Sequence, residues 1–130
     1  MIEEVKEERE ENILIVDDSP IMLSLLEEAL TELYFTNIIK ASNGIKALEI
    51  LNCQKIDLIM TDWSMPEMDG LKLVENIKSN EDLSKIPIIM ITTKSNQEYI
   101  VKAIKAGVND YIIKTFTTEI IREKIAKLLP

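Results

Sequence analysis

Short apolar runs, separated by amphipathic stretches, are the feature of this chain that most restricts its fold. Each run is rich in isoleucine and nearly continuous, which is typical of strands that are covered on both faces. The runs are ILIV (13–16), NIIKA (37–41), DLIMT (57–61), IPIIMIT (86–92) and DYIIK (110–114). A helical pattern follows each run. The sequence therefore predicts an α/β fold, a single doubly wound (βα)5 domain with a parallel sheet.

The amphipathic stretches also contain signals for helix boundaries. Ser19 suits the N-cap of the first helix and Pro20 its first position. Ser95 and Glu98 have capping-box spacing at the start of the fourth helix, and Gly107 suits a left-handed C-cap at its end. The apolar stripe predicted for the first helix consists of Ile21, Met22, Leu25, Leu26, Ala29, Leu30 and Leu33.

Composition narrows the range of functions. The 130 residues carry a net charge of -8 and include one cysteine and no histidine. An acidic chain is a poor binder of nucleic acid, and without histidine or paired cysteines any metal must be a hard cation held by oxygen. No apolar run approaches the roughly 20 residues that span a bilayer. We therefore expect a cytoplasmic protein with an acidic tail over 1–11 and a folded domain over 12–130.

Charged and hydroxyl side chains follow the predicted strands at the points where these strands end. Asp17 and Asp18 follow the first strand, and Asp62 follows the third. Thr92 ends the fourth strand and Lys114 ends the fifth. Taken singly, each has an ordinary explanation as a helix cap, a β-forming residue or a solvated charge. Together they indicate a site, because ligands bind at the carboxyl edge of a parallel sheet.

The chemistry of these groups favours phosphoryl transfer. Asp17, Asp18 and Asp62 can hold Mg2+, which takes a few carboxylates and keeps several waters. Lys114 and Thr92 supply the cation and hydroxyl that a transferred phosphoryl group needs. A carboxylate can also act as the nucleophile and form an aspartyl phosphate. Asp62 is the best candidate because it follows the predicted central strand.

Four segments closely resemble the receiver domain of bacterial two-component response regulators, and the likeness is strongest to the single-domain chemotaxis regulators. The segments are LIVDDSP, LIMTDWSMPEMDGLKLV, IPIIMITTKS and AGVNDYIIKTFT, in this order within residues 12–129. The resemblance implies a flavodoxin-like strand order 2-1-3-4-5. It also implies a phosphorylation-activated signalling switch, which is not a turnover enzyme and catalyses only its own phosphorylation and dephosphorylation.

The same resemblance implies a role for each residue of the acidic site. Asp62 is the expected acceptor of a phosphoryl group from a histidine kinase. Asp17 and Asp18 are expected to bind Mg2+ together with Asp62, and the backbone carbonyl of Ser64 resembles a further ligand. Thr92 resembles the hydroxyl that moves toward the phosphoryl group.

The implied readout lies on the face formed by the fourth helix, the fifth strand and the fifth helix. Tyr111 resembles the aromatic residue whose rotamer follows phosphorylation, although packing alone also explains it. Lys94, Lys102 and Lys105 belong to the same face, where they bind a downstream partner or are simply solvated. The implied partners are a flagellar motor switch, if the chain is of the chemotaxis type, and a phosphatase. We expect a monomer.

Three positions depart from the family's pattern or vary within it. The family has proline after the lysine, with a cis bond between them, whereas Thr115 follows Lys114 here. A cis bond before a non-proline residue costs about 3–4 kcal/mol, so we expect a trans bond although the site geometry favours cis. The other two positions, which vary within the family, are Ser64, two residues after Asp62, and Lys94, two residues after Thr92 and near the mouth of the site. We hypothesise that Lys94 contacts a phosphoryl oxygen or hinders the attacking water.

Three alternatives stay open at this point. The chain could be the receiver part of a longer DNA-binding regulator. A haloacid-dehalogenase-type phosphatase also uses an aspartyl phosphate, but its two aspartates are separated by one residue, whereas Asp17 and Asp18 are adjacent. A flavin-binding domain would need a phosphate loop rich in hydroxyl groups and glycine after the first strand, where this chain has carboxylates.

Overall fold

The computed structural model describes residues 7–130, in which the strands form one parallel sheet ordered β2-β1-β3-β4-β5. The strands are β1 (Arg9–Val16), β2 (Phe35–Ala41), β3 (Leu58–Thr61), β4 (Ile88–Thr92) and β5 (Asp110–Ile113). The helices are α1 (Pro20–Glu32), α2 (Gly44–Cys53), α3 (Gly70–Lys78), α4 (Gln97–Ala106) and α5 (Thr118–Ala126). The predicted fold class and strand order are confirmed.

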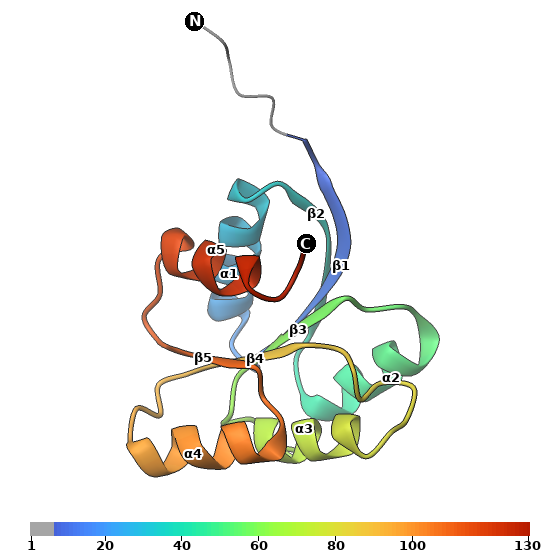
Figure 1. Ribbon diagram of the computed structural model, residues 1–130, viewed down its shortest axis with the longest axis vertical. Coiled ribbons are helices and arrows are strands. Elements are labelled where there is room, and N and C mark those ends of the chain that lie inside the picture. Colours follow the sequence, from blue (N-terminus) through green and yellow to red (C-terminus); the bar gives the residue numbers. More distant parts are fainter. Residues whose placement is uncertain (1–6) are drawn as a thin grey trace, which may run out of the picture.

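The helices cover both faces of the sheet, as Figure 1 shows. Helices α1 and α5 pack on one face, and α2, α3 and α4 pack on the other. Successive strand residues point to opposite faces. Ile13 and Ile15 therefore belong to the core under α1 and α5, while Leu14 and Val16 belong to the core under α2, α3 and α4. This arrangement explains why the apolar runs are continuous rather than alternating.

Most of the predicted helix ends are confirmed. The Ser19 side chain accepts a hydrogen bond from the Met22 N–H and Pro20 begins α1, while Gly107 ends α4 at φ 116°. The predicted capping box at Ser95 is wrong. The N-cap of α4 is Asn96, and its side chain makes no capping bond. Because the helix begins one residue later than the spacing suggested, Glu98 lies at the second helical position rather than the third.

The stripe predicted for α1 is wider than the face that α1 buries. Ile21 is 75% exposed and Leu25 is 45% exposed, although both were expected to face the core. The buried residues are Leu23, Leu26, Ala29 and Leu30. Since α1 lies against the sheet on one side and α5 on another, only part of its apolar surface is covered.

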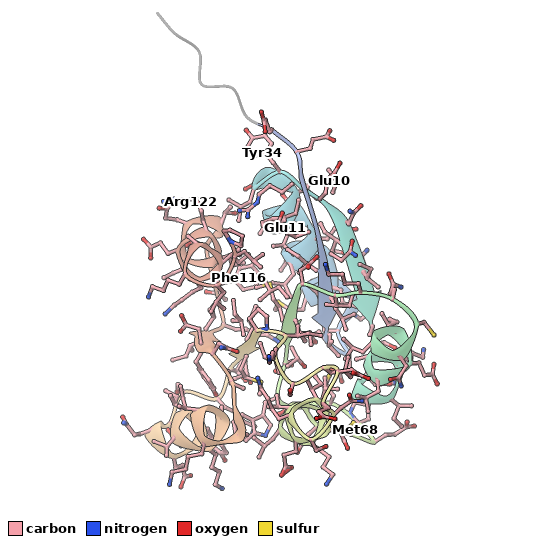
Figure 2. The ribbon with its side chains drawn as sticks, turned by 45° about the vertical axis from the view of Figure 1, so that its right-hand side comes forward. Glu10, Glu11, Tyr34, Met68, Phe116 and Arg122 are labelled. Atoms are coloured by element: carbon pink, nitrogen blue, oxygen red, sulfur yellow. The ribbon has the colours of Figure 1, made fainter. Side chains whose placement is uncertain are left out.

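The predicted tail over residues 1–11 is wrong at its C-terminal end, because residues 9–11 belong to β1. Arg9 pairs with Phe35 of β2, and its guanidinium carbon lies 4.6 Å from the centroid of the Phe35 ring. Figure 2 shows Glu10 and Glu11 at this end of the sheet. The charged residues therefore form the partly solvated N-terminal end of β1 rather than a segment without structure. Residues 1–6 lie outside the described part of the chain.

Candidate functional site

An acidic cluster lies at the carboxyl edge of the sheet. Asp17, Asp18 and Asp62 each offer a carboxylate oxygen, and these oxygens lie within 4.8 Å of one another. Val16 of β1 pairs with Thr61 of β3, so the residues that follow them, Asp17 and Asp62, lie side by side at the carboxyl end of the sheet. Asp17 is 1% exposed and Asp62 is 8% exposed, whereas Asp18 is exposed. The cluster therefore has a buried floor and one solvent-facing carboxylate.

Lys114, which follows β5, completes this cluster. Its Nζ donates to Asp17 Oδ2 at 2.8 Å and to Asp62 Oδ2 at 3.0 Å. The remaining oxygens of these carboxylates accept backbone bonds, from Ser19 N–H to Asp17 Oδ1 at 2.9 Å and from Trp63 N–H to Asp62 Oδ1 at 2.6 Å. The structure thus brings together four of the residues that the sequence singled out.

The charges in this cluster do not balance. Burial raises the pKa of Asp17, and this effect outweighs the hydrogen bonds from Lys114 and Ser19, which lower it. Burial disfavours the charged form of Lys114, but its bonds to Asp17 and Asp62 more than compensate, so the pKa of Lys114 is raised. By formal charge the cluster has three acidic side chains and one lysine, which contacts Asp17 and Asp62. The surplus negative charge suits a small, hard cation.

Our expectation of a trans bond between Lys114 and Thr115 was wrong, because the bond is cis. The prediction rested on the local preference of a non-proline residue. In the folded chain the local preference competes with the contacts of Lys114 to the two buried carboxylates. Those contacts depend on the whole fold, which local sequence does not reveal.

The loop after β3 wraps tightly around the acceptor candidate. The Gly70 N–H donates to the Trp63 carbonyl at 2.7 Å, and Asp69 caps α3 by accepting from the Lys72 N–H. A Cβ at Gly70 would lie 2.0 Å from the Asp62 backbone oxygen. Glycine is therefore required here for close approach of two backbones, and sequence reasoning did not identify this role.

Thr92, Lys94 and Tyr111 meet on the other side of the site. Thr92 is 1% exposed, and its Oγ1 accepts from the Lys94 N–H at 3.3 Å. The Tyr111 hydroxyl donates to the Lys94 carbonyl at 2.6 Å, so the Tyr111 ring is directed at the loop between β4 and α4. Burial raises the pKa of Tyr111, and the nearby Asp62 carboxylate adds to this shift.

An open hollow of about 460 Å³ lies next to the acidic cluster. Its walls include Asp18, Ser64 and Lys94, which come from three different loops. Lys102 and Lys105, by contrast, are exposed residues of α4 and do not line this hollow. α4, β5 and α5 also expose apolar side chains that the sequence did not single out. These side chains are Val101, Ile104, Ile113 and Ile120.

A parallel sheet in this order, with paired aspartates after β1, a buried aspartate after β3 and a lysine after β5, defines a receiver domain of the response regulator type. The family model of the response regulator receiver domain matches residues 13–126. The chain belongs to this family.

Similar proteins support the assignment over almost the whole chain. The chemotaxis protein CheY-3 of Vibrio cholerae is 41% identical over 89% of this chain and 89% of its own length. The chemotaxis protein CheY1 of Helicobacter pylori is 40% identical over 90% of this chain and 95% of its own.

Among solved structures, the receiver domain of the sensor histidine kinase PA1611 of Pseudomonas aeruginosa superposes with a TM-score of 0.84 and 27% identity. The match covers 92% of this chain and 98% of that one, which holds a magnesium ion in its active-site cleft. Within residues 7–130, no helix is long and apolar enough to cross a membrane.

Proposed function

We propose that this chain is a phosphorylation-activated switch in which Asp62 accepts a phosphoryl group from a histidine kinase in a Mg2+-dependent reaction. The observation that carries the proposal is the contact of one ammonium, Lys114, with both Asp17 and Asp62 inside a cluster of three carboxylates. A helix cap or a solvated strand end would not be expected to combine these groups at the edge of the sheet.

The donor atoms of the cluster fit Mg2+. The residues that would hold it are Asp17, Asp18 and Asp62, with the backbone carbonyl of Ser64 as a further oxygen ligand. Exposed Asp18 leaves room for metal-bound water, which Mg2+ retains in most protein sites. Once bound, Mg2+ supplies positive charge that offsets the repulsion between the carboxylates and an incoming phosphoryl group.

The chain's own residues then perform the transfer. A carboxylate oxygen of Asp62 attacks phosphorus, the bond from phosphorus to the histidine nitrogen of the kinase breaks, and the imidazole leaves with that electron pair. Lys114 stays close enough to exchange its bond to Asp62 for one to a phosphoryl oxygen. The Thr92 hydroxyl, buried at the end of β4, supplies a hydrogen-bond donor for another phosphoryl oxygen.

The readout surface that we propose consists of α4, β5 and α5. Tyr111 links it to the site, because its hydroxyl holds the loop that follows Thr92. The surface that we propose also includes exposed Lys102 and Lys105 and the exposed apolar side chains of α4, β5 and α5. A mixed apolar and basic surface suits a protein partner with an acidic rim.

We further propose that the switch belongs to a chemotaxis-type phosphorelay, with a component of the flagellar motor switch as its partner. The support is the similarity to two chemotaxis proteins at 41% and 40% identity, over nearly their full lengths. The receiver part of a longer DNA-binding regulator is the second candidate. A pull-down with motor-switch protein and with promoter DNA, each before and after phosphorylation, separates the two.

Trp63, the one tryptophan of the chain and the neighbour of Asp62, reports on the proposed reaction. Adding Mg2+ and then acetyl phosphate or beryllofluoride should change its fluorescence, and Asp62→Ala should abolish the change. A response that survives Asp62→Ala would refute the assignment of the acceptor. Sustained turnover of a chromogenic phosphate ester would instead favour a phosphatase.

A further inference from the structure

We propose that Tyr99 is a positioning residue, which holds the Lys94 ammonium at the mouth of the site and so prolongs the life of the phosphoryl group on Asp62. This proposal rests on the proposed function. It concerns the loop between β4 and α4 and the first turn of α4.

The Lys94 side chain has a specific partner rather than free solvent. Its Nζ lies 4.6 Å from the centroid of the Tyr99 ring, a distance at which the cation is attracted to the face of the ring. Lys94 is half-buried, although its neighbours Thr93 and Ser95 are exposed. A solvated lysine on such a loop would be expected to extend into water.

The Tyr99 ring itself packs against Trp63, the residue that follows the proposed acceptor Asp62. Its centroid lies 5.3 Å from that of Trp63, and the two ring planes meet at 80°. Trp63 is 7% exposed and directly follows Asp62. Edge-to-face aromatic pairs of this kind favour one geometry. The position of the Lys94 ammonium is therefore connected, through two aromatic rings, to the residue that would carry the phosphoryl group.

The backbone of Lys94 is anchored on both sides. Its N–H donates to Thr92 Oγ1 at 3.3 Å, and its carbonyl accepts from the Tyr111 hydroxyl at 2.6 Å. These bonds fix where the side chain leaves the loop, and Tyr99 fixes where it ends. Lys94 consequently forms one wall of the hollow that also contains Asp18 and Ser64.

This wall lies where water can reach the phosphorylated site. In hydrolysis a water oxygen attacks phosphorus, the bond from phosphorus to the Asp62 oxygen breaks, and inorganic phosphate leaves a regenerated carboxylate. A lysine held in the wall narrows the approach of that water. A cation–π contact at a partly exposed position is weak, so releasing Lys94 should accelerate hydrolysis by only about two- to five-fold.

The test measures the release of inorganic phosphate after the phosphodonor has been removed from the phosphorylated protein. We expect Tyr99→Leu to accelerate release by about two- to five-fold, Lys94→Ala to do the same, and Tyr99→Phe to leave the rate unchanged, because phenylalanine keeps the ring face. Lys46→Ala, at an exposed lysine of α2 outside both the acidic cluster and the proposed readout surface, is the matched control and should not alter the rate.

The double variant distinguishes positioning from a general loosening of the loop. If Tyr99 acts through Lys94, Tyr99→Leu should add nothing in a Lys94→Ala background. Equal acceleration by Tyr99→Leu in both backgrounds would overturn the proposal, as would an unchanged rate in Lys94→Ala. Phosphorylation of the wild-type protein is measured before any variant is compared. A wild-type protein that gains no phosphoryl group would refute the proposed function as well.

Discussion

Gly70 occupies a position where a side chain would collide with the residue that carries the proposed chemistry. Its missing Cβ would lie 2.0 Å from the Asp62 backbone oxygen and 2.9 Å from the Trp63 Cα. Backbone atoms cannot move aside as the end of a side chain can. Helix α3 can therefore begin directly against Asp62 and Trp63 only because this residue is glycine.

We predict that Gly70→Ala lowers the free energy of unfolding by about 2–3 kcal/mol, at the upper part of the range for overpacked sites. Gly44→Ala is the matched control. A Cβ at Gly44 would meet the flexible Met68 side chain at 2.9 Å, so its cost should be smaller. Urea denaturation followed by circular dichroism measures both variants. Equal losses would contradict this explanation of Gly70.

At the scale of elements, helix ends test how far local sequence determines local structure. Thr117 caps α5 by accepting from the Ile120 N–H at 3.1 Å. Ser95 has the sequence signature of a cap at α4 but makes no such bond, since the helix begins after Asn96. The two residues therefore offer a direct comparison between a formed cap and an apparent one.

We predict that Thr117→Ala lowers the free energy of unfolding by about 1 kcal/mol, the usual cost of removing an N-cap. Ser95→Ala should change it by less than about 0.5 kcal/mol, as surface substitutions do. Thermal and urea denaturation provide the comparison. A larger loss from Ser95→Ala than from Thr117→Ala would show that the capping box forms after all.

The strands were easier to predict than their ends. Continuous isoleucine-rich runs locate all of the strands in residues 7–130. In β3, β4 and the second half of β1, burial on both faces leaves no polar alternation, whereas the edge strands β2 and β5 are only partly buried. The start of β1 at Arg9 was missed, because its charged side chains resemble those of a tail. Only pairing with β2 shows that the segment is a strand, and pairing is a long-range property that local composition does not encode.

At the scale of the whole molecule, the fold gathers like charges that repel one another. Three acidic side chains follow β1 and β3, and two of them, Asp17 and Asp62, contact the ammonium of Lys114. Sequence reasoning found this group because parallel strands bring their carboxyl ends to one edge. It missed the contact of Trp63 with Tyr99, because that contact depends on the conformation of two loops.

We predict that Mg2+ stabilises the folded protein, because the cation binds the assembled cluster and not the unfolded chain. At a free concentration near 100 times the dissociation constant, the gain is about 2.7 kcal/mol. Asp18→Asn removes one charged ligand at an exposed position and should reduce the gain, whereas Asp82→Asn, an exposed residue outside the cluster, should not. Thermal denaturation with and without Mg2+ measures both, and identical shifts would contradict the assignment of Asp18.

The central claim is that Asp62 is the phosphoryl acceptor, and peptide mass spectrometry tests it most directly. The protein is incubated with acetyl phosphate, with and without Mg2+, and then digested and mapped. We predict one phosphoryl group per chain, located on Asp62, dependent on Mg2+ and absent from Asp62→Asn but present in Asp82→Asn. A phosphoryl group on another residue, or equal labelling of Asp62→Asn, would contradict the account.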